Sequence, residues 1–287
     1  MIPAAPHHAS PPVAPEGRLG ASGFAVALAL LLSACAGDAP PPPEEAGPEI
    51  VYGTAVPLGG GNMRTYMVSE GDLPVELGVA FDEATLATLP PQHGPGSVPM
   101  PDGNSTYQHI LELPAGHGTP FQFALVDWNP GGHEPPGVYD IPHLDLHFYL
   151  VSDETRMGID PMNPEFMAMA AAMPAPELMP PGHIHPMPEP TAVPMMGVHW
   201  LDPASPEVAG TGAFANTYIY GTWNGELIFM EPMITVALLQ ARPNIRQIVP
   251  VPERYATPGH YPTEYLARWD EGAQEYRVAL SGFRPAG

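Results

Sequence analysis

The chain has 287 residues and a formal net charge of −22, with 9 Lys and Arg against 31 Asp and Glu. Because like charges repel, this balance argues against nucleic acid as a partner and against anionic lipid as a surface for the folded body. It favours cations or neutral partners, and solubility, for example in a salty habitat, is the alternative explanation of the charge. The single cysteine excludes an intramolecular disulfide, and 42 Pro with 30 Gly disfavour long helices and favour short strands joined by many turns.

The first 34 residues have the pattern of a bacterial lipoprotein signal peptide. Arg18 precedes a run of small or apolar residues, 20–34, that is shorter than the roughly 20 apolar residues needed to span a bilayer. The run ends in Leu32-Ser33-Ala34-Cys35, which resembles the lipobox of such proteins. The resemblance implies that residues 1–34 are removed and that Cys35 carries acyl chains such as palmitate, which anchor the protein to a membrane. An ordinary signal peptide beside a free cysteine is the alternative interpretation.

The residues around Cys35 also predict a tether and a location. Residues 35–49 are rich in Pro and are expected to form an extended tether between the lipid and the fold. Ala36, not aspartate, follows the cysteine, and resemblance to the sorting rule of such lipoproteins implies an outer-membrane lipoprotein that faces the periplasm or the exterior. Residues 1–17 are rich in Pro and His, which is unusual for a signal peptide, so we expect the start codon further in.

Residues 50–287 are predicted to form a single β-rich domain. Short segments rich in aromatic and β-branched residues indicate strands at 63–69, 75–81, 107–113, 121–128 and 144–151. Helices are expected at 82–89, with Asp82 as the cap, and at 164–173. Hairpins are expected at 217–223 with 226–230, across Asn224-Gly225, and at 261–269 with 276–283. These features predict a mainly β fold, a single β-sandwich or barrel-like domain with one or two short helices and long Pro-rich loops.

The segment 128–152 carries the candidate chemistry. In it, His143, Asp145 and His147 alternate with leucines, so on a strand they share one face. Burying such a face without partners is costly, so it either faces water or holds a ligand. Neutral imidazole and carboxylate bind first-row metals, and a divalent metal site is therefore one hypothesis beside a merely solvated polar face.

Strand geometry limits how these side chains share an ion. His143 and His147 are roughly 13 Å apart on a flat strand. Both can bind metal only if a bulge after Pro142 brings them to one ion or if a second ion is present. Asp145 and His147, two residues apart, fit one ion more easily. A further ligand must come from another segment, with His199 as first choice and His133 as second. We predict that His147 and His199 bind the same ion, with Asp145 or His133 completing the shell.

Two glutamates lie beside these candidates, and the donor set suggests the metal. Glu134, in a loop made pliable by Gly131 and Gly132, is a candidate catalytic base or a partner of a ligand. Glu231, before Pro232, is another candidate carboxylate. Zinc is the first expectation for nitrogen and oxygen ligands, and copper, iron or manganese would accept the same set.

The same residues carry a family resemblance. His133-Glu134-Pro135-Pro136, followed by Pro142-His143, Asp145 and His147-Phe148-Tyr149, resembles the signature of an uncharacterised family of exported bacterial β-proteins and lipoproteins. Its later blocks resemble residues 193–200 and 220–235 of this chain. The resemblance covers roughly residues 105–240 and implies that these blocks form one site-bearing unit, without an assigned activity.

A second segment, 157–196, combines nine methionines with His183 and His185. Thioethers bind Cu(I) and imidazoles bind copper in either state, so a copper-handling envelope protein is an alternative function. Methionine also fills gaps in cores, and packing beneath a Pro-rich loop is the other interpretation.

Three classes of function therefore stay open. The chain is a metal-dependent enzyme on a small-molecule substrate that the sequence does not name, a metal-binding or copper-handling lipoprotein, or a non-catalytic structural or binding protein of the envelope. The membrane is the expected partner, through Cys35, and a homo-oligomer is compatible with the sequence. No phosphate-binding loop is recognisable, because Gly59-Gly60-Gly61 lacks a following Lys and Ser or Thr.

Overall fold

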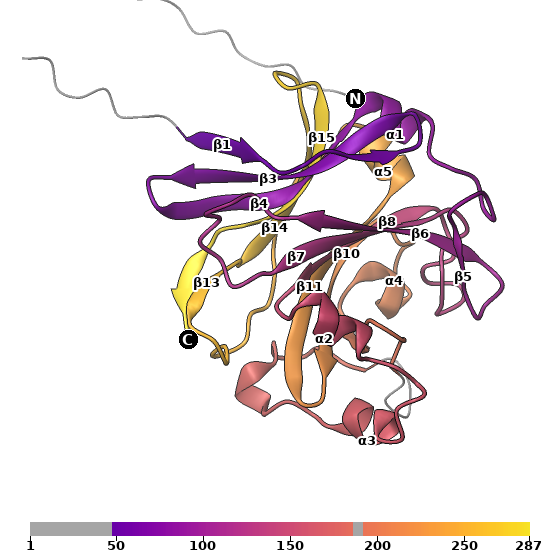
Figure 1. Cartoon of the computed structure of the whole chain (residues 1–287), viewed down its shortest axis with the longest axis vertical. Helices are drawn as coiled ribbons and strands as arrows, with labels where there is room; N and C mark the ends of the chain where they lie inside the picture. Colours follow the sequence, from indigo (N-terminus) through magenta and orange to yellow (C-terminus); the bar gives the residue numbers. More distant parts are fainter. Residues whose placement is uncertain (1–47, 186–191) are drawn as a thin grey trace, which may run out of the picture. The chain divides into compact units, whose positions relative to one another are not determined.

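The computed structural model describes residues 48–185 and 192–287, and these residues build two seven-stranded antiparallel sheets and a two-stranded ribbon. Neither large sheet closes into a barrel within this part of the chain, and the arrangement is that of a β-sandwich (Figure 1). The predicted signal peptide, Cys35 and nearly all of the predicted tether lie outside the described residues. Among the helices of the described residues, none is long and apolar enough to cross a membrane.

The first sheet joins strands from both ends of the described chain. Its order is β1 (Glu49–Tyr52), β3 (Gly61–Glu70), β4 (Leu73–Asp82), β15 (Glu275–Ser281), β14 (Glu264–Asp270) and β12 (Asn244–Ile248), with β2 (Val56–Leu58) paired to β3. The ribbon pairs β13 (Gly259–Tyr261) with β16 (Arg284–Ala286).

The second sheet contains the segment that carries the candidate chemistry. Its order is β5 (Val98–Pro99), β6 (Ser105–Glu112), β7 (Phe123–Asn129), β8 (His143–Tyr149), β11 (Glu226–Thr235), β10 (Asn216–Trp223) and β9 (Val198–Trp200). The predicted Asn224-Gly225 hairpin therefore joins β10 to β11, and both turn residues have the positive φ that such a turn requires.

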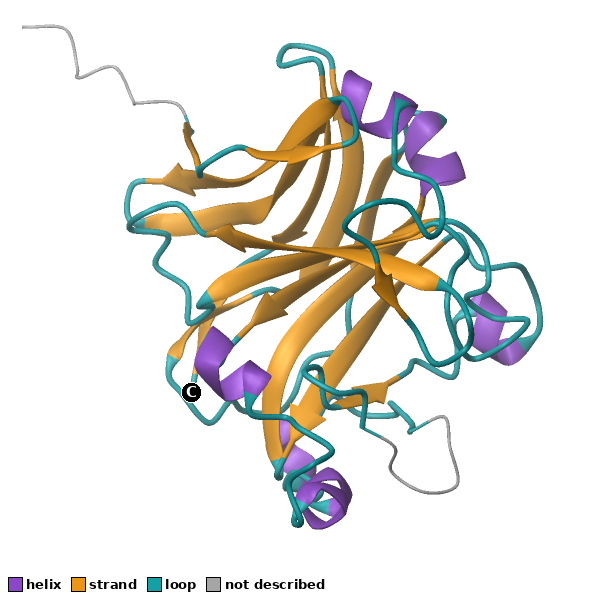
Figure 2. Cartoon of the chain, turned by 45° about the vertical axis from the view of Figure 1, so that its right-hand side comes forward, coloured by secondary structure: helices purple, strands orange, loops and turns teal. Residues whose placement is uncertain are grey.

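The strands expected from the sequence are confirmed, as is the β14–β15 hairpin. Five short α-helices are present in residues 48–185 and 192–287, where one or two were expected, and Figure 2 shows them at the margins of the strands. They are α1 (Glu83–Ala87), α2 (Asp153–Met157), α3 (Phe166–Ala171), α4 (Pro206–Ala209) and α5 (Val236–Gln240), with a 3-10 turn at Pro176–Leu178.

The extra helices α2, α4 and α5 escaped prediction because each has only about one turn, and side-chain caps hold α2 and α5. Asp82 caps α1 as expected, with its carboxylate accepting a hydrogen bond from the backbone N–H of Thr85 at 2.8 Å. Ser152 and Thr235 cap α2 and α5 in the same way. A helix of about one turn, held by its cap, is too short to show an apolar period in the sequence.

The main core lies between the two sheets. Leu77 and Phe81 of β4 belong to it together with Leu144, Leu146 and Phe148 of β8. Every residue of β7 and β8 is buried, so the face of β8 that points away from this core is also covered. A smaller apolar cluster packs there, formed by Tyr139, Leu201, Phe214, Ile219 and Met233.

Gly221 is required by the packing of β10 against β11. It pairs with Phe229, and a Cβ atom at Gly221 would overlap the Phe229 ring. We expect Gly221→Val to lower the free energy of unfolding by about 1–3 kcal/mol, because overpacking forces the ring to move. Gly272→Ala is the control, because a Cβ atom there meets only Asp270 at 3.4 Å. Equal denaturant midpoints for Gly221→Val and the unchanged protein would contradict this packing.

Candidate metal centre

The predicted polar face of β8 exists, and it is buried. His143, Asp145 and His147 alternate with Leu144 and Leu146, and their exposures are 0%, 4% and 1%. The structure therefore rules out a merely solvated polar face. The three side chains must find compensation inside the protein.

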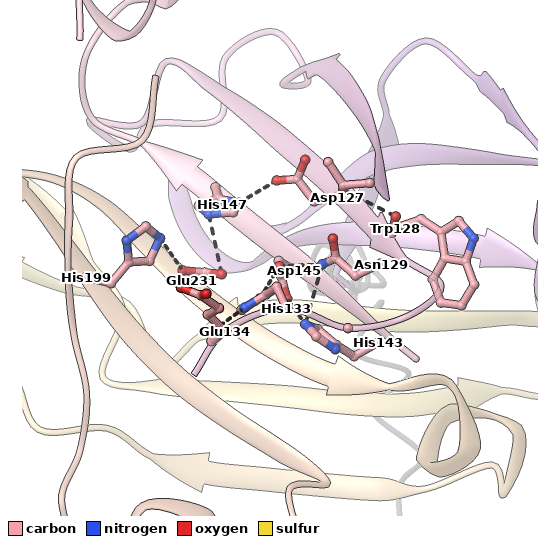
Figure 3. Close-up of polar contacts among 12 residues, drawn as sticks. Asp127, Trp128, Asn129, His133, Glu134, His143, Asp145, His147, His199 and Glu231 are labelled. Atoms are coloured by element: carbon pink, nitrogen blue, oxygen red, sulfur yellow. Dashed lines mark hydrogen bonds and ion pairs between the residues drawn. The ribbon is translucent and has the colours of Figure 1, made fainter. Parts of the chain in front are cut away.

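Two groups of potential metal ligands form on this face (Figure 3). The sheet cluster consists of His147, His199 and Glu231, all on strands. The loop cluster consists of His133, on the loop before β8, with His143 and Asp145. Within each cluster, one donor atom per residue lies within 4.8 Å of the others. The trio of β8 is thus divided between two clusters, as the second-ion alternative requires.

The sheet cluster is assembled by strand register. The pairings Met230 with Phe148 and Met233 with Asp145 place Glu231 opposite His147 on adjacent strands. Nε2 of His147 lies 3.4 Å from Oε1 of Glu231, and Nε2 of His199 lies 3.9 Å from Oε2. The two imidazole ring centres are 6.2 Å apart, a separation compatible with a shared ion.

Further groups lie beside these two imidazoles. Nδ1 of His147 lies 3.3 Å from a carboxylate oxygen of Asp127 on the neighbouring strand β7. The ring of His199 has a hydrogen bond with the backbone of Gly197. Such outer contacts orient an imidazole so that its other nitrogen points at a metal.

The loop cluster has the same construction with different outer partners. Nδ1 of His143 is 2.6 Å from the carbonyl oxygen of Ile141, and Nε2 is 3.1 Å from Oδ1 of Asp145. Nδ1 of His133 is 2.6 Å from the carbonyl oxygen of Glu134, and Nε2 is 3.2 Å from Oδ2 of Asp145. In both clusters, therefore, the Nε2 atoms converge on a carboxylate.

A further amide orients the carboxylate of the loop cluster. Asn129, the last residue of β7 and two positions after Asp127, donates from Nδ2 to Oδ2 of Asp145 at 2.7 Å. Neither Asp127 nor Asn129 was among the residues that the sequence singled out. The sequence shows them as two polar residues in an otherwise apolar strand. They can be recognised as partners of the site only when the pairing of β7 with β8 is known.

Several buried polar atoms at this centre have no hydrogen-bond partner among the described residues. They are both carboxylate oxygens of Asp127, Oδ1 of Asp145, both ring nitrogens of His147 and Oε2 of Glu231. A buried polar atom without a partner costs about 1–3 kcal/mol. Because these unpartnered atoms gather at one place, we infer that the side chains are arranged to bind a ligand and not only one another.

The electrostatics of the sheet cluster follow from burial and close charges. Burial by itself lowers the pKa of His147, but the carboxylates of Glu231 and Asp127 raise it to about 9. Burial and repulsion by His147 lower the pKa of His199 to about 3, so this imidazole is neutral at pH 7 and ready to act as a ligand. Burial raises the pKa of Glu231 to about 8, although His147 opposes this shift.

The loop cluster shows the opposite balance at its carboxylate. Burial tends to raise the pKa of Asp145, but His143 and His133 hold it well below its usual range. Burial lowers the pKa of His133, and Asp145 more than reverses this and raises it to about 9. Each cluster therefore has one imidazole that keeps a proton near pH 7 unless a cation replaces it.

The donor spacing is compatible with a small first-row ion after modest movement of the side chains. A tetrahedral site with bonds near 2.05 Å has donor–donor edges of about 3.3 Å. The nitrogen–oxygen separations are 3.4 and 3.9 Å to the two different oxygens of Glu231, and 3.1 and 3.2 Å to the two different oxygens of Asp145, so each carboxylate would turn to present one oxygen to an ion. Each cluster offers two imidazoles and one carboxylate, a set used for zinc and for non-haem iron.

The structure groups the predicted residues differently from the expected shell. His147 and His199 share a cluster, as predicted, but Glu231 is the carboxylate beside them. Asp145 and His133 belong to the loop cluster instead. The reason is register, because Glu231 faces His147 across a strand pair while Asp145 lies nearest His143 and the loop.

Glu134 contacts the centre only through its backbone. Its carbonyl oxygen is the partner of His133, whereas its side chain is exposed. The carboxylate that sequence analysis considered as a catalytic base thus has no described contact with either cluster. Its role as a base stays a prediction.

The methionine-rich segment is dispersed over different environments. Met157, Met162, Met167 and Met173 are exposed, whereas Met169, Met179 and Met196 pack against the core. The ring of His183 contacts Tyr220, and the ring of His185 contacts Trp200. Met187 lies outside the described residues, so the copper hypothesis stays a prediction.

Comparison with protein-family models, with curated proteins and with solved structures finds no match to this chain. The resemblance to an exported β-protein family therefore stays a prediction. What can be said of function comes from the residues of the two clusters.

The metal-free protein should lose stability as the pH rises from 6.5 to 8.5. The pKa of His147 is about 9 when folded, above its usual value of 6.5. Its contribution is therefore fully present below pH 6.5 and is lost as the pH approaches 9. We expect the melting temperature to fall by roughly 5–10 °C across this interval.

With zinc bound, the imidazoles are already neutral, so the stabilisation by zinc should widen over the same interval. Differential scanning calorimetry with a chelator and with zinc measures both effects. A metal-free protein that becomes more stable between pH 6.5 and 8.5 would contradict the assigned charges.

Proposed function

We propose that this chain is an exported, lipid-anchored protein of the cell envelope whose β domain binds a divalent metal ion at the sheet cluster. Zinc is the first candidate, and iron, manganese or copper accept the same donors. The proposal combines the lipobox-like sequence at Cys35 with the buried arrangement of His147, His199 and Glu231.

One observation carries the metal proposal. Nε2 of His147 and Nε2 of His199 lie 3.4 and 3.9 Å from the two oxygens of Glu231, while Nδ1 of His147 lies 3.3 Å from Asp127 and the ring of His199 is hydrogen-bonded to the backbone of Gly197. A mere ion pair needs no second partner behind each imidazole. Oriented imidazoles with a free inner nitrogen are the usual construction of a metal site.

The donor number suggests an open site. Two imidazoles and one carboxylate leave one position of a tetrahedral zinc ion for water, whose pKa the metal lowers toward about 7. The side chain of His199 is 21% exposed, so this end of the cluster is the one that solvent approaches. The protein is proposed as metal-binding, and a reaction would need a substrate that these residues do not define.

We expect His147→Ala and His199→Ala each to lose one equivalent of zinc relative to the unchanged protein. Removing one imidazole leaves only two protein ligands at the sheet cluster. Metal content after dialysis against micromolar zinc, measured by mass spectrometry, checks this, with circular dichroism as the test of folding. His260→Ala is the control, because His260 lies on β13 and belongs to neither cluster. Full zinc content in both variants would refute the proposal.

The lipid anchor has a separate test. Cys35→Ser removes the thiol that accepts the acyl chains, so the protein should move from the membrane fraction to the soluble fraction after cell lysis. Ser33→Thr is the matched control, because it alters the lipobox-like sequence and keeps Cys35. If Cys35→Ser still sediments with membranes as the unchanged protein does, the anchor is not at this residue.

A further inference from the structure

The two clusters differ in the negative charge that they offer a cation. The sheet cluster has Glu231 as ligand and Asp127 behind His147, both buried. The loop cluster has a single carboxylate, Asp145, and its two imidazoles are backed by the neutral carbonyl groups of Ile141 and Glu134. A divalent ion is therefore balanced by two carboxylates in the sheet cluster and by only one in the loop cluster.

The missing negative charge is not supplied by neighbouring residues of the loop. The side chains of Glu134 and Asp140 are exposed, and Asp140 accepts a hydrogen bond from the backbone of Gly137 at 3.0 Å. Asp145 itself already accepts the amide of Asn129, which weakens it as a donor to metal. Glu231 also acts electrostatically on His133, but its charge is already paired with the ion proposed at the sheet cluster. An ion at the loop cluster would thus keep one unbalanced positive charge in a buried place, which is costly.

The two clusters are separate groups of donors that share no residue. The strand spacing between Asp145 and His147 is roughly 6.6 Å at about 3.3 Å per residue, longer than the about 3.5–4 Å between ions in bridged two-metal sites. We therefore treat the loop cluster as completing its own coordination and balancing its own charge.

We propose that the loop cluster binds a second divalent ion, more weakly than the sheet cluster, and that this ion takes a small monoanion such as a carboxylate as its fourth ligand. The inference rests on the proposed function, because the sheet cluster is the reference for affinity and charge. The buried Oδ1 atom of Asp145 lies 3.1 Å from Nε2 of His143 but forms no hydrogen bond of suitable geometry among the described residues, and a cation between the two atoms would bind both.

The surroundings limit the anion to a small one. The ring of Tyr139 lies 5.7 Å from the ring of His133, and the ring of Phe214 lies 5.2 Å from the ring of His143, both measured between centres. These aromatic walls leave the approach on the side of His133, whose side chain is 22% exposed. A carboxylate of one or two carbons suits such an approach, whereas a bulky polyanion does not.

Cobalt and acetate test this inference on the purified full-length protein. Co²⁺ replaces zinc, and its visible absorption reports a change of ligands. We expect two equivalents to bind, the second at least tenfold more weakly, and acetate to change only the spectrum of the second. Sodium perchlorate at equal ionic strength is the control, because perchlorate coordinates weakly.

Two variants assign the response to a cluster. His133→Ala should keep the tight equivalent and lose the acetate response, and the retained tight equivalent shows that the variant folds. His199→Ala should lose the tight equivalent and keep the response to acetate. An acetate response that persists in His133→Ala, or one equivalent only in the unchanged protein, overturns the inference and leaves the proposed function intact. No cobalt binding at all overturns both.

Discussion

Strand β8 is covered on both faces, and only one of those faces is apolar. Leu144, Leu146 and Phe148 complete the core between the sheets, so the strand cannot turn its polar face to water without exposing them. Two imidazoles and a carboxylate are thus forced into the interior, where each needs a partner. The rest of the site follows from this constraint.

The neighbours of β8 supply those partners from every available direction. Strand β7 brings Asp127 and Asn129, β11 brings Glu231, β9 brings His199, and the loop before β8 brings His133. These side chains nevertheless do not form a complete hydrogen-bond network, because three polar atoms of the partners and three of β8 itself have no hydrogen bond among the described residues. Cations would satisfy this arrangement without further protein groups. They would also join β8 to β9 and β11 and the loop to β8, so that binding energy becomes folding energy in a chain with one cysteine.

The sequence predicted the strands and the shared face well, because alternation along a single strand is a local property. The shared face of Asp145 and the two histidines of β8 could be predicted without knowing which strands pair with β8. The same is true of the Asn224-Gly225 turn. The partners depend on which strand lies beside β8 and in which register. The sequence could name Glu231 only as one candidate carboxylate, because it does not show that β11 pairs with β8. Asp127 was not recognised, because the sequence does not show that β7 pairs with β8 or in which register.

Anomalous diffraction from crystals of the zinc-loaded protein, measured on both sides of the zinc absorption edge, tests the central claim most directly. The account predicts a peak about 2.0–2.2 Å from Nε2 of His147, Nε2 of His199 and an oxygen of Glu231. A crystal that binds zinc elsewhere, with no peak among these three residues, would contradict it.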